Sequence, residues 1–253
     1  MRPAHAARPA EDTPAGKSDV RSRTERERPM TSAKTLVVLS GGIDSVVLAH
    51  ACKAEGREVS AIAIDYGQRH RKELEYAGRA AGKLNIDLTV ADLGGYSRLM
   101  RGFSLTDADV TVPDEHYTRT GSVNVVPNRN PVFMTVAYAH AVLAGAQEMC
   151  LGFLAEDAAT APDTSPEFLA AFNAMEARAL EGLADPPPRV TAPLLTLRKA
   201  DVLLVGTELG VDWRETWTCF KGERFHCGSC ASCHDRRNAF AEADLADPTR
   251  YQR

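Results

Sequence analysis

The stretch LVVLSGGIDSVVLAHA, from Leu36 to Ala51, carries the strongest structural signal in the chain. An apolar run is interrupted by Ser-Gly-Gly at residues 40–42 and then resumes with helical spacing. The pattern predicts a buried strand, a tight glycine turn and an α-helix. Free N–H groups and a partial positive charge at such a helix start suit phosphate oxygens. The stretch therefore predicts a phosphate-binding loop in an α/β fold, with a plain strand-to-helix turn as the alternative.

The residue types of this loop fit contact with a nucleotide. Two glycines allow a sharp turn and a close approach of the backbone to a ligand, and two serine hydroxyls add donors. Asp44 would repel phosphate directly, so we expect it to hold a bridging Mg²⁺ or another substrate group. The loop is not a Walker A loop, because GxxxxGK[ST] is missing. The residues predicted to bind ATP are Leu39, Ser40, Gly41, Gly42, Ile43, Asp44, Ser45, Val46 and Val47.

Apolar runs and helical patterns alternate along the rest of the chain. The predicted strands are Thr35–Leu39, Glu58–Asp65, Ile86–Leu93, Glu148–Phe153 and Arg189–Leu194. The predicted helices are Asp44–Glu55, Arg69–Leu84, Asn130–Ala144, Glu167–Leu180 and Arg198–Leu209, the last capped by Thr196. Such alternation predicts a parallel sheet covered on both faces, with an irregular stretch at Gly94–Arg129. Ligands of these sheets bind beyond the carboxyl ends of the strands.

Composition sets broad limits on the protein. A length of 253 residues allows one large α/β domain with a small appendage, and the net charge of −4 disfavours a nucleic-acid surface. The sequence contains no run of about 20 apolar residues, so it predicts no membrane-spanning helix. Residues 1–33 are rich in Pro, Ala, Arg and Glu and are predicted to be disordered. Met30 is an alternative start, and the missing signal-peptide core leads us to expect a cytoplasmic protein.

Four cysteines cluster near the C-terminus with intervals of seven, two and two residues; they are Cys219, Cys227, Cys230 and Cys233. The spacing predicts a closed, structural Cys₄ zinc site, with an iron–sulfur cluster as the alternative. Without an export signal, metal ligation is favoured over disulfides. Cys52 and Cys150 lie in apolar segments and are expected in the core. The predicted organisation is a tail (1–33), an ATP-binding domain (34–210) and a zinc module with a C-terminal helix (211–253).

Several motifs together resemble one family closely. These are SGGIDS at 40–45, DYGQRH at 65–70, VPNRN at 126–130, LRKAD at 197–201 and CFKGERFHCGSCASCHDRR at 219–237. The chain resembles the 7-cyano-7-deazaguanine synthase family, within the N-type ATP pyrophosphatase (PP-loop) superfamily. The likeness implies that ATP adenylates 7-carboxy-7-deazaguanine, that ammonia displaces AMP, and that further ATP-driven activation dehydrates the amide to the nitrile. It also implies diphosphate as a product, Mg²⁺, structural zinc and a homodimer.

Candidate residues for this chemistry follow the strands and open one helix. Asp44 and Ser45 in the loop, together with Arg129 and Lys199 as phosphate-facing cations, are the predicted catalytic residues. Either cation has an alternative interpretation as a solvated surface charge, and Tyr66 as a packed strand-end tyrosine. The predicted substrate-binding residues are Tyr66, Gln68, Arg69, His70, Asp157 and Asp163.

One segment departs from the family pattern. The family typically has an aromatic-Pro-Asp-Cys run where this chain has Ala161, Pro162, Asp163 and Thr164. A missing ring beside a planar heterocycle forfeits stacking of about 0.5–1.5 kcal/mol. The alternative function is therefore a synthase-like paralogue that adenylates a deazapurine or other acid and transfers it to a different amine, such as a protein N-terminus. A tRNA-thiolating enzyme and a non-catalytic zinc module are further alternatives, disfavoured by the net charge and by the loop respectively.

Overall fold

Five parallel strands form the central sheet, in the order β3-β2-β1-β4-β5. The computed structural model describes residues 32–252, so the predicted disorder of residues 1–31 and the alternative start at Met30 lie outside the described residues. The strands are β1 (Lys34–Val38), β2 (Glu58–Asp65), β3 (Leu88–Asp92), β4 (Glu148–Cys150) and β5 (Arg189–Thr191). Val37 of β1 pairs with Ala61 on one side and with Cys150 on the other. The strand order reverses between β1 and β4, which places a crevice at their carboxyl ends.

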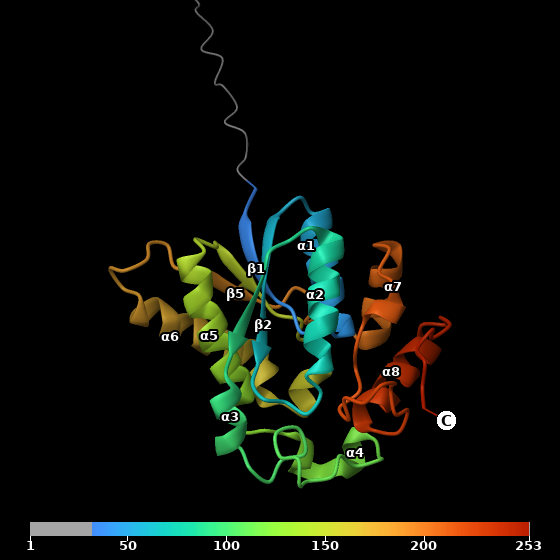
Figure 1. Cartoon of the computed structure of the whole chain (residues 1–253). Coiled ribbons are helices and arrows are strands. Elements are labelled where there is room, and N and C mark those ends of the chain that lie inside the picture. The colour runs from blue at the N-terminus through green and yellow to red at the C-terminus, as the bar shows by residue number, and fades with distance from the viewer. Residues whose placement is uncertain (1–31, 253) are drawn as a thin grey trace, which may run out of the picture. The chain divides into compact units, whose positions relative to one another are not determined.

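Helices cover both faces of this sheet (Figure 1). One face carries α1 (Ile43–Ala54), α2 (Lys72–Leu84) and α7 (Lys199–Glu208), and the other carries α5 (Arg129–Leu143) and α6 (Pro166–Ala179). Each face has its own apolar core, built around Val47 and Leu203 on the first and around Met134 and Phe172 on the second. The predicted parallel α/β fold is confirmed, and every predicted strand and helix is present; β2 has the predicted bounds, and the other elements have at least one shifted end.

Two predicted details of helix starts are wrong. Thr196 does not cap α7: Arg198 is the N-cap residue, and its N–H donates to Asp201 at 3.0 Å. A turn closed by Leu197 N–H and Leu194 O (2.9 Å) leaves Thr196 two residues ahead of the N-cap Arg198. Helix α2 starts at Lys72 and not at Arg69, whose N–H donates to Leu105 O at 2.9 Å.

The stretch predicted to be irregular contains three short helical turns: α3 (Gly94–Leu99), α4 (Tyr117–Thr120) and the 3₁₀ turn η1 (Gly121–Asn124). In Figure 1, α3 and α4 lie below the sheet, on the side of the strands' carboxyl ends. Arg69 fixes the chain between α3 and α4. Its guanidinium donates to the carbonyl oxygens of Ser104 (3.1 Å), Asp107 (2.8 Å), Ala108 (3.1 Å) and Val110 (2.6 Å). These four backbone contacts give Arg69 a structural task, and its predicted contact with substrate stays a prediction.

The cysteine-rich C-terminal segment shares the core of the sheet. Residues 32–252 belong to one compact unit, and Trp213 and Phe240 pack in the same cluster as Leu39 and Val47. Helix α8 (Ala231–Glu242) holds the fully buried Arg236, whose guanidinium donates to Trp213 O and to Thr216 Oγ1, both at 2.8 Å. None of the helices between residues 32 and 252 has the length and apolar character needed to cross a bilayer.

Candidate active site and metal centre

The loop between β1 and α1 is shaped by its own hydroxyl groups. The Ser40 N–H donates to Ser45 Oγ at 3.1 Å, and Ser45 Oγ donates to Gly42 O at 3.2 Å. Gly41 has a φ of +83°, and a Cβ there would lie 2.4 Å from Glu73 O. Because backbone cannot yield as a flexible side chain does, only glycine lets α2 approach the loop this closely.

The apolar residues predicted to bind ATP lie beneath the loop. Leu39, Ile43, Val46 and Val47 are each at most 3% exposed and belong to the core cluster. Their side chains therefore support the loop, and any contact with a nucleotide falls to the backbone and to the polar residues.

Lys199, the first residue of α7, lies beside Asp44 of the loop. Its Nζ is 3.6 Å from Asp44 Oδ2 and 2.5 Å from Asp235 Oδ2 on α8. The Lys199 N–H donates to Glu156 at 3.2 Å. Asp157, in the 3₁₀ turn η2 (Asp157–Ala159), accepts from Leu154 N–H at 2.9 Å and feels the charge of Lys199. The structure thus brings together three of the predicted residues and adds Asp235.

Burial sets the proton affinities of this group. It raises the pKa of Asp44, an effect that Lys199 opposes and Asp235 reinforces. Burial also raises the pKa of Asp157 to about 6. Although burial disfavours its charge, Asp44 and Asp235 hold the pKa of Lys199 well above the usual range. The Lys199 cation therefore lies next to two acids, Asp44 and Asp157, whose pKa values are raised by burial.

A second polar cluster lies at the carboxyl end of β2. Gln68, 2% exposed, accepts from Tyr66 N–H at 2.9 Å and donates to Glu73 Oε1 at 2.8 Å. His70 Nε2 is 3.5 Å from Glu73 Oε2, and His70 Nδ1 is buried without a partner among residues 32–252. Arg129, at the start of α5, lies within hydrogen-bonding reach of the Tyr66 hydroxyl. Gln68 thus has a structural task, whereas Arg129 lies near enough to His70 to lower the pKa of the imidazole.

In this second cluster the pKa values of Glu73 and His70 are both shifted in the direction that favours the uncharged form. Burial raises the pKa of Glu73 to about 7, against the effects of Gln68 and Arg129. Burial, together with Arg129 and Arg69, lowers the pKa of His70 to about 3. His70 is therefore a neutral imidazole at physiological pH, next to a carboxyl group that exchanges its proton there.

Aromatic rings pack around Tyr66 of this cluster. Tyr66 is 3% exposed and packs 4.7 Å from the Phe133 ring and 6.4 Å from the Tyr96 ring. Its packed position agrees with the alternative interpretation of a strand-end core tyrosine. Phe133 and Tyr96 keep part of their surface exposed.

The segment Ala161–Thr164, which departs from the family pattern, contains the 3₁₀ turn η3 (Pro162–Thr164). Thr164 is 3% exposed and donates to Ala161 O at 2.7 Å, so its hydroxyl serves its own turn. Asp163 accepts from the Asn130 amide at 3.0 Å, which ties η3 to the start of α5 beside Arg129.

The four C-terminal cysteines meet in one cluster. Their sulfur atoms all lie within 4.8 Å of one another, and Cys227 Sγ is 3.8 Å from Cys233 Sγ. Backbone N–H groups of Ser229 (3.4 Å) and Cys230 (3.2 Å) point at Cys227 Sγ, as suits a thiolate. The cluster can hold a metal, as the spacing predicts.

These sulfur separations fit a single ion. A tetrahedron with zinc–sulfur bonds of about 2.3 Å has an edge of about 3.8 Å. An iron–sulfur cluster would sit between the cysteines and spread their sulfur atoms further apart. His226, which flanks the cysteines in sequence, accepts from Thr218 N–H at 3.2 Å and stacks 4.2 Å from the Trp217 ring.

The cysteine cluster is connected to the phosphate loop by a backbone hydrogen bond. The Trp217 N–H, two residues before Cys219, donates to Gly41 O at 2.9 Å. Cys52 and Cys150 lie elsewhere in the core, 2% and 0% exposed, as predicted.

Two residues of the site escape sequence reasoning. Glu73 is a carboxylate in the first turn of a charged amphipathic helix, where acids are common for their interaction with the helix dipole. Asp235 follows Cys233 by two residues, and only the packing of α8 against α7 brings it to Lys199.

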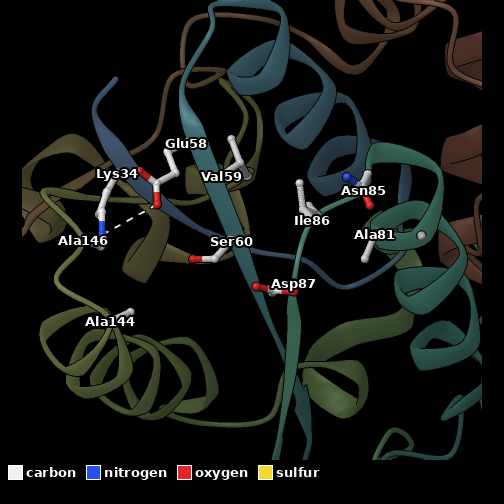
Figure 2. Close-up of a pocket in the computed structure, with 11 residues that line it drawn as sticks. Lys34, Glu58, Val59, Ser60, Ala81, Asn85, Ile86, Asp87, Ala144 and Ala146 are labelled. Atoms are coloured by element: carbon white, nitrogen blue, oxygen red, sulfur yellow. Dashed lines mark ion pairs between the residues drawn. The ribbon is translucent and has the colours of Figure 1, made fainter. Parts of the chain in front are cut away.

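A hollow of about 560 Å³ lies at the opposite, amino-terminal end of the strands. Lys34 and Glu58, an ion pair at 3.6 Å, stand on one side of it, and Asn85 and Asp87 on the other (Figure 2). The hollow contains none of the predicted site residues.

This chain is similar to several known proteins. A 7-cyano-7-deazaguanine synthase from Agrobacterium fabrum is 41% identical over 87% of this chain and 92% of its own length. One from Paracoccus denitrificans is 42% identical over 87% of this chain and 93% of its own length. The solved NMN synthetase from Francisella tularensis aligns with a TM-score of 0.49 at 14% identity, over 86% of this chain and 79% of its own.

The family model described as "Queuosine biosynthesis protein QueC" matches residues 34–244. The match and the synthase relatives confirm the predicted family and the prediction of an enzyme of the ligase type. The chain belongs to the QueC family of queuosine biosynthesis proteins.

Proposed function

We propose that this protein converts 7-carboxy-7-deazaguanine and ammonia to 7-cyano-7-deazaguanine, with ATP activating the carboxylate as an acyl adenylate. One observation carries the proposal: the phosphate loop, Asp44 and Lys199 lie together beside the β1–β4 crevice in a chain of this family. The names of the relatives supply the product.

The reaction needs ATP because a carboxylate has no good leaving group. A carboxylate oxygen attacks the α-phosphorus of ATP, and diphosphate leaves. Ammonia then adds to the acyl carbon, and AMP leaves with loss of a proton to give the amide. The amide oxygen then attacks the α-phosphorus of a second ATP, with departure of diphosphate and of one N–H proton. Departure of AMP and of the other proton leaves the nitrile.

The phosphate loop is suited to the nucleotide half of this chemistry. Its N–H groups and the start of α1 favour phosphate oxygens, and Lys199 offsets the charge of the departing diphosphate. Asp44 Oδ1 is buried and has no hydrogen-bond partner within the described part of the chain, which fits a ligand of Mg²⁺. Mg²⁺ bound there would neutralise phosphate charge.

The second cluster is suited to the acid and to ammonia. Arg129 places a cation where the substrate carboxylate can be oriented. Glu73, with a pKa of about 7, can accept the proton that ammonium must lose before it attacks.

Transfer of the activated acid to another amine is the second candidate. The segment Ala161–Thr164 favours it. This segment has no aromatic side chain, and the Thr164 hydroxyl donates to the backbone of its own turn.

Mass spectrometry of products tests the proposal. Purified protein is incubated with Mg-ATP, 7-carboxy-7-deazaguanine and ¹⁵N-ammonium, and we expect AMP together with nitrile that carries one ¹⁵N. AMP or an adenylated acid without nitrile would favour the second candidate. Absence of ATP consumption with this acid would reject the proposed function and would leave the second candidate only with another acid.

A further inference from the structure

Asp235 lies outside the residues assigned to the reaction, yet its carboxylate reaches the phosphate-loop site. It projects from the first turns of α8, two residues after Cys233. Its Oδ2 is 2.5 Å from Lys199 Nζ, whereas the contact of the same nitrogen with Asp44 Oδ2 is 3.6 Å. The side chain of Lys199 is only 17% exposed, so solvent screens this pair weakly.

Two parallel ion pairs join α8 to the start of α7. Glu242 pairs with Arg198 at 3.4 Å, and both side chains are more than half exposed (57% and 59%). Asp235 pairs with the next residue, Lys199, and is 26% exposed. The Glu242–Arg198 pair does little to position either side chain because water screens it. The Asp235–Lys199 pair is less exposed and fixes a charge inside the site.

Competition among carboxylates determines where the Lys199 charge lies. Asp44, Asp235 and Asp157 all interact with this ammonium, as does the Tyr117 hydroxyl. A lysine ammonium is a compact charge on a flexible stem, so its closest carboxylate draws it from the others. With Asp235 closest, Asp44 Oδ1 stays buried and unpartnered with respect to residues 32–252.

We propose that Asp235 is a positioning residue that draws Lys199 toward α8 and thereby keeps the Asp44 carboxylate open for the magnesium nucleotide. The cysteine-rich segment then contributes a charge to the ATP site in addition to its metal. The inference rests on the proposed function in one respect: it takes ATP as the nucleotide. It does not depend on which acid is activated.

Replacement of Asp235 tests this role directly. In Asp235→Asn the size is kept and the charge is lost, so Lys199 moves to Asp44 and neutralises it. We expect the affinity for Mg²⁺ with α,β-methylene-ATP, measured by calorimetry, to fall about tenfold, the effect of one charge-assisted hydrogen bond. Asp235→Glu should recover most of the affinity, and in turnover assays the KM for Mg-ATP should rise more than kcat falls.

Glu242→Gln is the matched control, because it removes the other acid that pairs α8 with α7. It should bind the nucleotide like the unaltered protein. Wild-type affinity in Asp235→Asn, an equal loss in Glu242→Gln, or loss of bound metal and of thermal stability in both Asp235 variants would overturn the proposal. The binding assay contains no deazapurine, so nucleotide binding without nitrile formation would reject the proposed function and leave this inference standing.

Discussion

At the residue scale, Asp44 combines burial with charge. Burial raises its pKa, and Lys199 at 3.6 Å works against that effect. Asp44→Asn should lower turnover about 100-fold or more, because the charge that holds the cation of the nucleotide is lost. Metal content should stay unchanged. Steady-state kinetics and elemental analysis check this, with Asp109→Asn, an 85% exposed acid, as the control. Unchanged turnover would remove Asp44 from the mechanism.

Asp157 makes the stability of the protein depend on pH. Its pKa is raised from 3.8 to about 6 in the folded state, so the folded carboxyl group resists ionisation. The resulting destabilisation is absent below pH 3.8, grows up to about pH 6 and is complete above it. Asp157→Asn should therefore raise Tm by a few degrees at pH 8 and by less at pH 5. Calorimetric melting at both pH values checks this; a larger gain at pH 5 would contradict the assigned pKa.

The sequence located some site residues and not others for physical reasons. Asp44 and Lys199 lie in local motifs, and a local motif is readable from adjacent residues. Asp235 and Glu73 acquire their roles from packing between helices that are distant in sequence. Arg69 lies in a local motif too, but its contacts with four carbonyl oxygens of a neighbouring loop come from the fold and could not be predicted from the motif.

At the element scale, the fit of α2 against the phosphate loop depends on one missing methyl group. A Cβ at Gly41 would lie 2.4 Å from Glu73 O and 2.6 Å from Ala77 N, both backbone atoms. Gly41→Ala should therefore displace the loop from α2 and abolish detectable nucleotide binding, measured by calorimetry.

Gly56→Ala is the matched control. Gly56 has a similar φ of +75°, but no atom of the described chain lies within 4 Å of its added Cβ. This variant should lose about 1 kcal/mol of stability from backbone strain alone and still bind nucleotide. Equal behaviour of the two variants would mean that strain, and not the contact with α2, matters at the loop.

The elements were predictable because each strand and helix carries its own periodic signal. Apart from β2, their ends were not both predicted, since contacts with other segments influence them. The segment before α2 is held by the bond from the Arg69 N–H to Leu105 O, and the turn from Leu194 to Leu197 precedes a cap at Arg198 and not at Thr196.

At the scale of the whole molecule, the cysteine cluster, the core and the loop form one connected body. Trp217 N–H binds Gly41 O, and Trp213 packs in the core of the sheet. Cys230→Ser should release the metal, lower Tm and weaken nucleotide binding together, because the segment that supports the loop loses its closure. Elemental analysis, melting and calorimetry check this on one preparation. Retained nucleotide affinity after metal loss would show the two sites to be independent.

The central claim is that the carboxylate is adenylated at the phosphate loop. With 7-carboxy-7-deazaguanine labelled by ¹⁸O in its carboxylate, Mg-ATP and ammonium, we would measure the mass of the AMP released. The claim predicts AMP that carries one ¹⁸O atom, because the oxygen that attacks the α-phosphorus leaves with AMP. Unlabelled AMP, or ADP with phosphate in its place, would contradict it.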